Sequence, residues 1–153
     1  MSAVDIILPT YNHAEFLNRA IDGIVEQEFT DYTLIIVNDG SCDRTQQILN
    51  DRLCGGLKAK VIVHPQNKGL PAALNTGHAA GNSPYCMWVS SDNVSLPKQV
   101  STLYNKIIEG YDFVQGDWIA VKKDGTRVEK CIVGCTDNWG FGNLCANHMY
   151  KRE

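Results

Sequence analysis

The chain has 153 residues, of which 44% are hydrophobic and 20% charged, with a formal net charge of -3. This size and composition are typical of one globular domain with a single core. The charge and the lack of a long Lys/Arg cluster argue against a nucleic-acid partner. Without an apolar run of 18 residues or a secretory signal at residues 1–10, we expect a cytoplasmic protein, with a peripheral place at the inner face of the membrane as the alternative.

The six cysteines raise the question of disulfides or a metal site. We do not expect disulfides, because the chain is longer than disulfide-scaffold domains and Cys86 lies in an apolar, strand-like run. Cys131, Cys135, Cys145 and His148 offer zinc-ligand chemistry, but their spacing is loose and no second C-x-x-C pair supports it. We therefore interpret His148 as a strand residue or a surface group.

In chain order, short apolar runs alternate with segments of helical periodicity. We predict β-strands at residues 4–8, 33–37, 61–63, 85–89 and 113–115. We predict helices at residues 15–27, 43–53, 69–80 and 97–110. The segments 118–121 and 127–133 read as a hairpin around Asp124-Gly125. Strands separated by helices imply βαβ units, so the predicted class is α/β, with a mainly parallel sheet flanked by helices and an antiparallel extension at the end.

Polar residues follow four of the predicted strands. In an open α/β sheet, ligands bind beyond the carboxyl ends of the strands, so these loops are the candidate site. They contain Thr10-Tyr11-Asn12, Asn38-Asp39-Gly40-Ser41, Pro65-Gln66-Asn67-Lys68-Gly69 and Ser90-Ser91-Asp92-Asn93. Neither a G-x-G-x-x-G motif nor a Walker loop is present, so a dinucleotide cofactor and a P-loop triphosphate are not indicated.

The four loops belong to the strings ILPTYN, IIVNDGSCDRT, NKGLPAALNTG and CMWVSSDNVSLP. In their order and spacing the sequence resembles the family-2 glycosyltransferases over essentially its whole length. The resemblance implies one Rossmann-like GT-A domain over residues 1–153. It also implies an inverting transferase, acting in pathways such as polysaccharide biosynthesis, that moves a sugar from a nucleotide diphosphate, expected to be UDP, to a glycan, lipid-linked or protein acceptor. The sequence is equally compatible with a monomer and a homo-oligomer.

The resemblance implies that Tyr11 stacks on the donor base and that Asp39 accepts a hydrogen bond from it. Both roles suit the chemistry of an aromatic face and of a fixed carboxylate. The alternative is that Tyr11 is a packed loop aromatic and Asp39 closes a turn with Gly40. The implied nucleotide-binding residues are Pro9, Thr10, Tyr11, Asn12, Asp39, Asn67, Gly69, Asn75 and Ser91.

The segment Asn67-Lys68-Gly69 precedes a predicted helix. We expect the free N–H groups and the dipole of that helix to orient an anionic or polar part of the donor. Lys68 itself reads as a solvated side chain. Gly77 also matches a position of the family, and we expect it to shape the nucleotide pocket.

The loop Ser90-Ser91-Asp92-Asn93 aligns with the acidic metal motif of the family, written DxD or DxDD. We predict Asp92 and Asn93 as ligands of Mg²⁺ or Mn²⁺ on the donor diphosphate, because hard cations prefer oxygen ligands. The sequence departs from the motif, since Asp92 is its sole carboxylate. The alternative is that Asp92 only caps the turn before Pro97.

Inversion requires a general base near the acceptor hydroxyl. In the resembling family this acid lies beyond the segment that residues 143–152 match, so we expect it beyond Glu153 in a longer chain. Asp117 and Asp137 do not occupy the position of the motif. The alternative function is a nucleotide-sugar-binding domain without transferase activity of its own. A nucleotidyltransferase is disfavoured, because LPTYNHAEF lacks a glycine-rich, basic loop.

Overall fold

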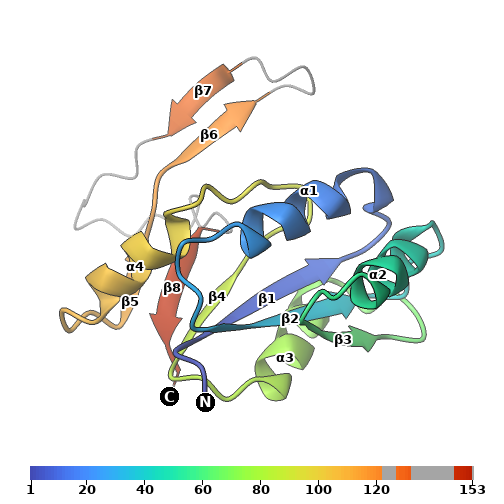
Figure 1. The fold of residues 1–153 in the computed structure, drawn as a ribbon, viewed down its shortest axis with the longest axis horizontal. Coiled ribbons are helices and arrows are strands. Elements are labelled where there is room, and N and C mark those ends of the chain that lie inside the picture. The colour runs from blue at the N-terminus through green and yellow to red at the C-terminus, as the bar shows by residue number, and fades with distance from the viewer. Residues whose placement is uncertain (122–126, 132–146, 153) are drawn as a thin grey trace.

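The computed structural model describes residues 1–121, 127–131 and 147–152. Its helices and strands form a mixed sheet with helices on both faces, which confirms the predicted α/β class (Figure 1). The elements are β1 (Val4–Thr10), α1 (Ala14–Val25), β2 (Tyr32–Asn38), α2 (Thr45–Cys54), β3 (Lys60–Val63), α3 (Leu70–Ala80), β4 (Tyr85–Trp88), α4 (Gln99–Ile107), β5 (Phe113–Gln115), β6 (Trp118–Val121), β7 (Arg127–Cys131) and β8 (His148–Lys151).

The main sheet has the strand order β3-β2-β1-β4-β8-β5. β1 pairs in parallel with β2 and β4, and β2 pairs in parallel with β3, as the alternation of strands and helices predicts. The antiparallel member is β8, which lies between β4 and β5. β8 was not predicted as an element, although His148 was interpreted as a strand residue or a surface group. Its sequence HMYK is not an apolar run, and its place depends on pairing with segments far away in the sequence.

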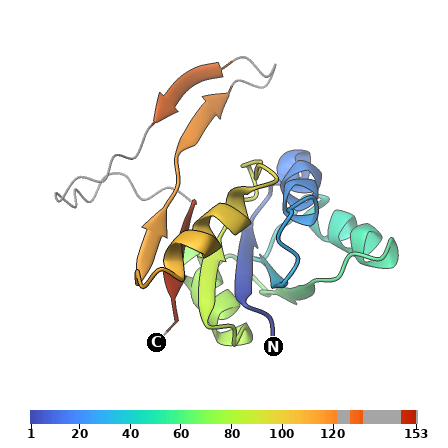
Figure 2. The same ribbon diagram turned by 60° about the vertical axis from the view of Figure 1, so that its left-hand side comes forward.

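The predicted hairpin is present, but it does not extend the main sheet. β6 and β7 pair with each other as a separate two-stranded sheet that points away from the rest of the fold (Figure 2). The turn at Asp124-Gly125 lies outside the described residues, as do Cys135, Asp137 and Cys145. The hairpin was expected to form the antiparallel extension of the sheet, whereas the antiparallel strand of the main sheet is β8.

The core has two layers, one on each face of the sheet. Helices α1, α2 and α4 cover one face, where Ile6 and Leu8 of β1 join the larger apolar cluster. Helix α3 covers the other face, and there a Cβ added to Gly77 would lie 2.4 Å from Ile7 Cγ2. Glycine thus lets α3 approach β1 closely. Gly77 is buried against the sheet and acts in packing there, and its expected role in shaping the nucleotide pocket stays a prediction.

The predicted first strand stops at Pro9, but β1 continues through Pro9 to Thr10. Proline is tolerated in this central strand because of where β4 ends. The Thr10 carbonyl accepts from Asp39 N, directly after β2, and the Ile7 carbonyl accepts from Val89 N, directly after β4. The backbone groups of alternate residues of β1 therefore point toward β2 and toward β4. Pro9 faces the β4 side, where the pairing has already ended at Trp88, so no ladder bond is lost.

At the amino end of the sheet, the carboxylate of Asp5 is fully buried and has three hydrogen-bond donors. Its Oδ1 accepts from Ser83 Oγ at 2.8 Å, and its Oδ2 accepts from Ser83 N at 2.9 Å and Arg152 Nη2 at 2.7 Å. The Arg152 guanidinium also donates to the His78 carbonyl at 2.7 Å. This ion pair, in which the Asp5 side chain is 1% and the Arg152 side chain 24% exposed, fastens the end of β8 to β1 across 147 residues of sequence.

We expect Arg152→Ala to lower the free energy of unfolding by on the order of 3 kcal/mol, because it leaves the buried Asp5 charge without its ionic partner. The matched control is Arg52→Ala, which removes an ion pair with Asp22 whose side chains are 30% and 48% exposed. That variant should lose less than about 1 kcal/mol. Urea denaturation measures both changes. Equal losses would contradict a special role for the buried pair.

Candidate functional site

The residues predicted for ligand binding gather beyond the carboxyl ends of the parallel strands. Pro9 and Thr10 form the buried end of β1, and the hydroxyl of Thr10 has no hydrogen-bond partner among the described residues. Tyr11 and Asn12 follow as exposed loop residues, and Asn75 is exposed in the middle of α3. The remaining predicted residues lie after β2, before α3 or after β4: Asp39, Asn67, Gly69, Ser91, Asp92 and Asn93.

Asp39 is the centre of this cluster. Its side chain follows β2, is only 3% exposed, and accepts hydrogen bonds from three donors. His64 Nδ1 lies 2.6 Å and Lys68 N lies 3.0 Å from its Oδ1, and Gly69 N lies 2.8 Å from its Oδ2. The carboxylate therefore ties the end of β2 to the end of β3 and to the start of α3. A buried charge requires such donors, because it has lost its hydration.

The backbone N–H groups of Lys68 and Gly69, directly before α3, donate to Asp39, and Gly69 N also lies 2.8 Å from Asn67 Oδ1. The expectation that the free N–H groups of α3 orient part of the donor stays a prediction. Two glycines make the close approach feasible. Gly69 has a φ of +86°, and a Cβ at Gly40, with a φ of +70°, would lie 2.4 Å from the carbonyl carbon of Gln66.

Burial acts to raise the pKa of Asp39, whereas the hydrogen bonds from His64, Lys68 and Gly69 lower it, and the net pKa is below the ordinary aspartate value. Asp39 is thus held as an acceptor-only carboxylate at neutral pH. A carboxylate has about four lone-pair positions. The three donors leave one position on Oδ2 for a further donor.

His64 was not singled out from the sequence. It follows β3 directly, is 6% exposed, and lies between Asp39 and Thr76 of α3. The Thr76 hydroxyl lies 2.9 Å from His64 Nε2. The sequence feature that could have identified it is a polar, ionisable residue directly after a predicted strand, at the same end of the sheet as Asp39. Its partners lie 25 and 12 residues away, so a local pattern does not identify them.

The loops after β1 and β2 are fastened to each other. Asn12, with a φ of 51°, accepts from Cys42 N at 2.9 Å through its Oδ1 and donates from its backbone N to Ser41 Oγ at 3.0 Å. Asp43 accepts from Ala14 N at 3.0 Å, at the start of α1, and from a backbone N–H at the start of α2. Together these contacts hold the segment that presents Tyr11, which is 41% exposed.

The loop after β4 completes the site. Ser91 is buried and its Oγ lies 2.6 Å from His13 Nδ1, which joins this loop to the one after β1. Asp92 and Asn93 are exposed, and Ser90 Oγ donates to Asp92 Oδ1. Among the described residues, no group of three or more His, Cys, Asp or Glu side chains is placed to hold a metal ion. Asp92 is thus the single carboxylate this loop offers.

His148, which the sequence analysis placed in a strand or on the surface, is a buried residue of β8. Its ring stacks on Phe113 at 5.2 Å between centroids and meets the edge of Trp88 at 6.1 Å. Asp117 is exposed, and its carbonyl accepts from Asn147 Nδ2 at 2.6 Å. Neither residue lies among the loops that surround Asp39.

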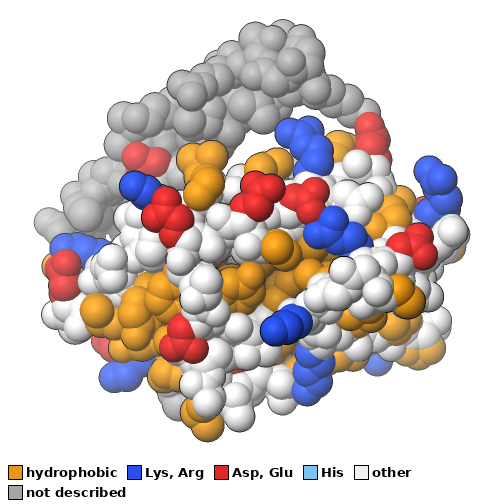
Figure 3. All heavy atoms as spheres, in the orientation of Figure 1, with side chains coloured by type: hydrophobic (Ala, Val, Ile, Leu, Met, Phe, Trp, Pro, Cys, Tyr) orange, Lys and Arg blue, Asp and Glu red, His pale blue; other side chains and the backbone are white. Residues whose placement is uncertain are grey.

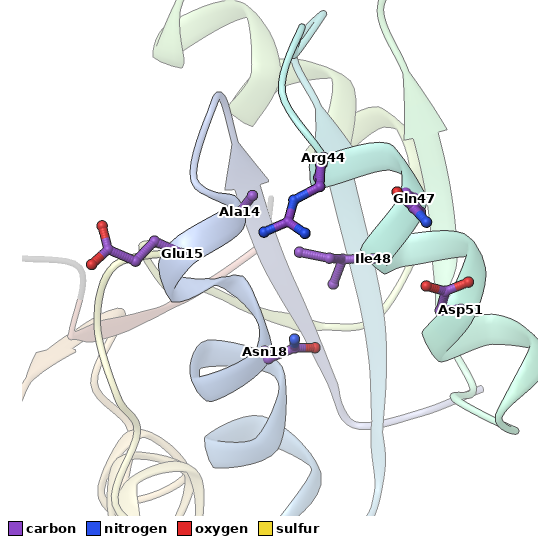
Figure 4. Close-up of a pocket in the computed structure, with 7 residues that line it drawn as sticks. All are labelled: Ala14, Glu15, Asn18, Arg44, Gln47, Ile48 and Asp51. Atoms are coloured by element: carbon purple, nitrogen blue, oxygen red, sulfur yellow. The ribbon is translucent and has the colours of Figure 1, made fainter.

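Three further observations concern the charged surface, the length of the helices and a cavity. Figure 3 shows acidic and basic side chains interspersed on one face, without a large area of one charge sign. No helix of the described part of the chain is long and apolar enough to cross a bilayer. A cavity of about 370 Å³ between α1 and α2 is drawn in Figure 4. It is lined by Ala14, Glu15, Asn18, Arg44, Gln47, Ile48 and Asp51, so it contains none of the predicted site residues.

We expect Asp39→Asn to reduce stability more at about pH 7 than at about pH 3. In the unfolded chain an aspartate titrates near about 3.9. Because the folded pKa is lower, the stabilisation is complete above the unfolded pKa and is lost as the pH falls through the folded one. Urea unfolding of both proteins over this pH range measures the difference, with the exposed Asp31→Asn as control. If the difference in the free energy of unfolding between the two proteins does not change with pH, the lowered pKa of Asp39 is contradicted.

Comparison with known proteins gives a consistent result. The model of the Glycosyl transferase family 2 matches residues 5–147. An uncharacterized glycosyltransferase of Rickettsia prowazekii is 33% identical over 105 residues, 67% of this chain and 31% of that protein. One from Haemophilus influenzae is 31% identical over 156 residues, 99% of this chain and 60% of that protein. Glycosyltransferase GlyA of Streptococcus pneumoniae is 32% identical over 107 residues, 69% of this chain and 15% of that protein.

Solved structures share the fold. S. aureus TarS 1-349 in complex with UDP-GlcNAc matches with a TM-score of 0.77 and 21% identity, over 99% of this chain and 45% of that one. The mannosyltransferase PcManGT from Pyrobaculum calidifontis, in complex with GDP-Man and Mn²⁺, matches with a TM-score of 0.71 and 18% identity, over 79% of this chain and 36% of that one. The present chain thus spans less than half of these two structures. With its GT-A fold and a family match over nearly its entire length, the chain belongs to glycosyl transferase family 2.

Proposed function

We propose that this chain binds a UDP-sugar at the carboxyl end of its sheet and belongs to an enzyme that transfers the sugar with inversion to an acceptor hydroxyl. The observation that carries the proposal is the state of Asp39. It is a buried carboxylate with three donors in place and one lone-pair position left on Oδ2. A pyrimidine imide N–H is a donor of the kind that such an acceptor requires.

The exposed aromatic ring of Tyr11 supports a nucleotide as the ligand. Tyr11 follows β1, whose end is paired with the end of β2 through Thr10 and Asn38, so it enters the site next to Asp39. A ring at this place offers a face for base stacking, which is worth about 1–3 kcal/mol per base. Thr10 adds a buried hydroxyl without a described partner, which a ligand can satisfy.

Two proteins that share the fold were solved with nucleotide sugars, UDP-GlcNAc in TarS and GDP-Man in PcManGT. They support a nucleotide sugar as the donor class. Asp39 favours a base that carries a ring N–H, as uracil does, over cytosine. Glycan, lipid-linked and protein molecules all stay open as acceptors.

A divalent cation is part of the proposal because a diphosphate leaving group needs charge neutralisation. The donor set of the β4 loop fits Mg²⁺ or Mn²⁺, since both accept oxygen ligands and are often held by one or two carboxylates together with substrate phosphates. Asp92 would supply the carboxylate and Asn93 an amide oxygen. When bound, the cation would offset the charge that develops on the diphosphate.

A second candidate function is donor binding without transfer by this chain alone. The reduced acidic motif favours it. The chain spans 31% and 15% of the length of two of its relatives. The general base for inversion was expected beyond Glu153. Release of UDP from a UDP-sugar in the presence of acceptors separates the two candidates, because a binding domain releases none.

We expect UDP to bind with a higher affinity than CDP, and Tyr11→Ala to weaken UDP binding by about 1–3 kcal/mol through the loss of stacking. Tyr11→Phe is the matched control, because it keeps the ring. Calorimetry with UDP, GDP, dTDP and CDP measures the affinities, and a rise in Tm with ligand is the independent check. If the protein binds none of these nucleotides, both candidate functions are contradicted.

We expect Mn²⁺ to strengthen UDP binding, and Asp92→Asn to abolish most of that gain while the affinity measured without metal stays unchanged. The reason is that Asp92 contributes through the cation and not through the nucleotide itself. Titrations of UDP with Mn²⁺ and with EDTA give the comparison, with Asp31→Asn as control. If Mn²⁺ strengthens UDP binding in Asp92→Asn as much as in the unmodified protein, Asp92 is not a ligand.

A further inference from the structure

His64 is a buried histidine whose two ring nitrogens both have partners. Nδ1 lies 2.6 Å from Asp39 Oδ1, and Nε2 lies 2.9 Å from the Thr76 hydroxyl. Because an ionised carboxylate can only accept, the Nδ1–H donates to Asp39. The Thr76 hydroxyl, on α3, fixes the other side of the ring. His64 is therefore held between the end of β3 and α3 with its proton on the carboxylate side.

The contact decides which lone pair of Asp39 is left over. The His64 ring and Lys68 N fill both positions of Oδ1, while Gly69 N fills one position of Oδ2. Lys68 and Gly69 donate from the backbone, so their direction is set by the chain. His64 provides the single side-chain donor among the three. It prevents Asp39 from turning Oδ1 toward another donor and so fixes the direction of the open position.

We infer that His64 is a positioning residue that sets the base preference of the donor site, by holding Asp39 so that Oδ2 accepts a ring N–H of the base. This inference rests on the proposed function. A uracil ring carries such an N–H at N3, whereas neutral cytosine carries a lone pair there and would face the carboxylate with an acceptor. The preference for UDP over CDP is thus a property of the Asp39 and His64 pair together.

A purely structural role for His64 makes a different prediction. If the ring only filled space between β3 and α3, its loss would disturb the site as a whole, and UDP and CDP would lose affinity by the same factor. If the ring orients Asp39, UDP alone loses affinity, because CDP does not use the open position. The ratio of the two affinities therefore distinguishes positioning from packing.

The experiment uses three variants of the protein. His64→Ala removes the donor, His64→Asn places an amide N–H near the position of Nδ1, and His64→Gln places it near the position of Nε2. The matched controls are the same substitutions at His78, which is partly buried in α3 and contacts Tyr150 and Arg152 at the opposite end of the sheet. Circular dichroism and the Tm establish that each variant is folded, and calorimetry gives the Kd for UDP and for CDP.

We expect His64→Ala and His64→Gln to weaken UDP binding by roughly tenfold, the size of one charge-assisted hydrogen bond. CDP binding should not change, and His64→Asn should recover most of the preference for UDP. The His78 variants should retain the preference. Should His64→Ala not fold, the comparison of His64→Asn with His64→Gln decides, because both are polar amides of similar size.

An unchanged ratio of the UDP and CDP affinities in His64→Ala and His64→Gln overturns the inference, as do equal losses for both nucleotides. Equal affinity of the unmodified protein for UDP and CDP also overturns it, yet leaves nucleotide-sugar binding standing. Failure of the unmodified protein to bind any nucleotide removes the proposed function itself. The two failures are therefore distinguishable.

Discussion

The site depends on one buried negative charge. Asp39 has almost no contact with water, so it must find its hydrogen-bond donors inside the protein. It finds them in His64 after β3 and in the backbone that leads into α3, and in doing so it brings segments 25 to 30 residues apart to one point. A carboxylate at the start of a helix is also favoured by the helix dipole. The same charge that organises the loops is the one that a donor base would meet.

Each end of the parallel sheet contains a buried aspartate. At the amino end, the buried Asp5 and the partly exposed Arg152 form an ion pair that fastens β8, the antiparallel strand, to β1. At the carboxyl end, Asp39 is buried in a similar way and accepts from His64 and from two backbone N–H groups. Gly81 leaves room for the Asp5 carboxylate, and Gly40 lets the loop after β2 approach the backbone of Gln66. Each carboxylate accepts from three donors, Asp5 beside the ion pair with Arg152 and Asp39 at the end of the sheet where the candidate site lies.

The exposed part of the loop after β4 has fewer contacts within the protein than Asp39 has. Ser91 is buried and held by His13, while Asp92 is exposed and meets only the neighbouring Ser90 among the contacts described. With one carboxylate, such a loop holds a cation weakly on its own, and the diphosphate of the donor must provide most of the ligands. Metal and nucleotide would then bind together rather than in sequence. This coupling follows from the reduced acidic motif and links the composition of one loop to the order of binding.

The sequence by itself determined the alternation of strands and helices, because periodicity and chain punctuation are local properties. It also located the polar loops after β1, β2, β3 and β4, since parallel strands end at one edge of a sheet. Only the tertiary structure decided that β8 lies between β4 and β5, that Pro9 remains within β1, and that His64 donates to Asp39. These features depend on pairing and burial between segments far apart in the chain. A local sequence pattern does not identify which buried acceptor a histidine will donate to, because the two residues come together only in the folded core.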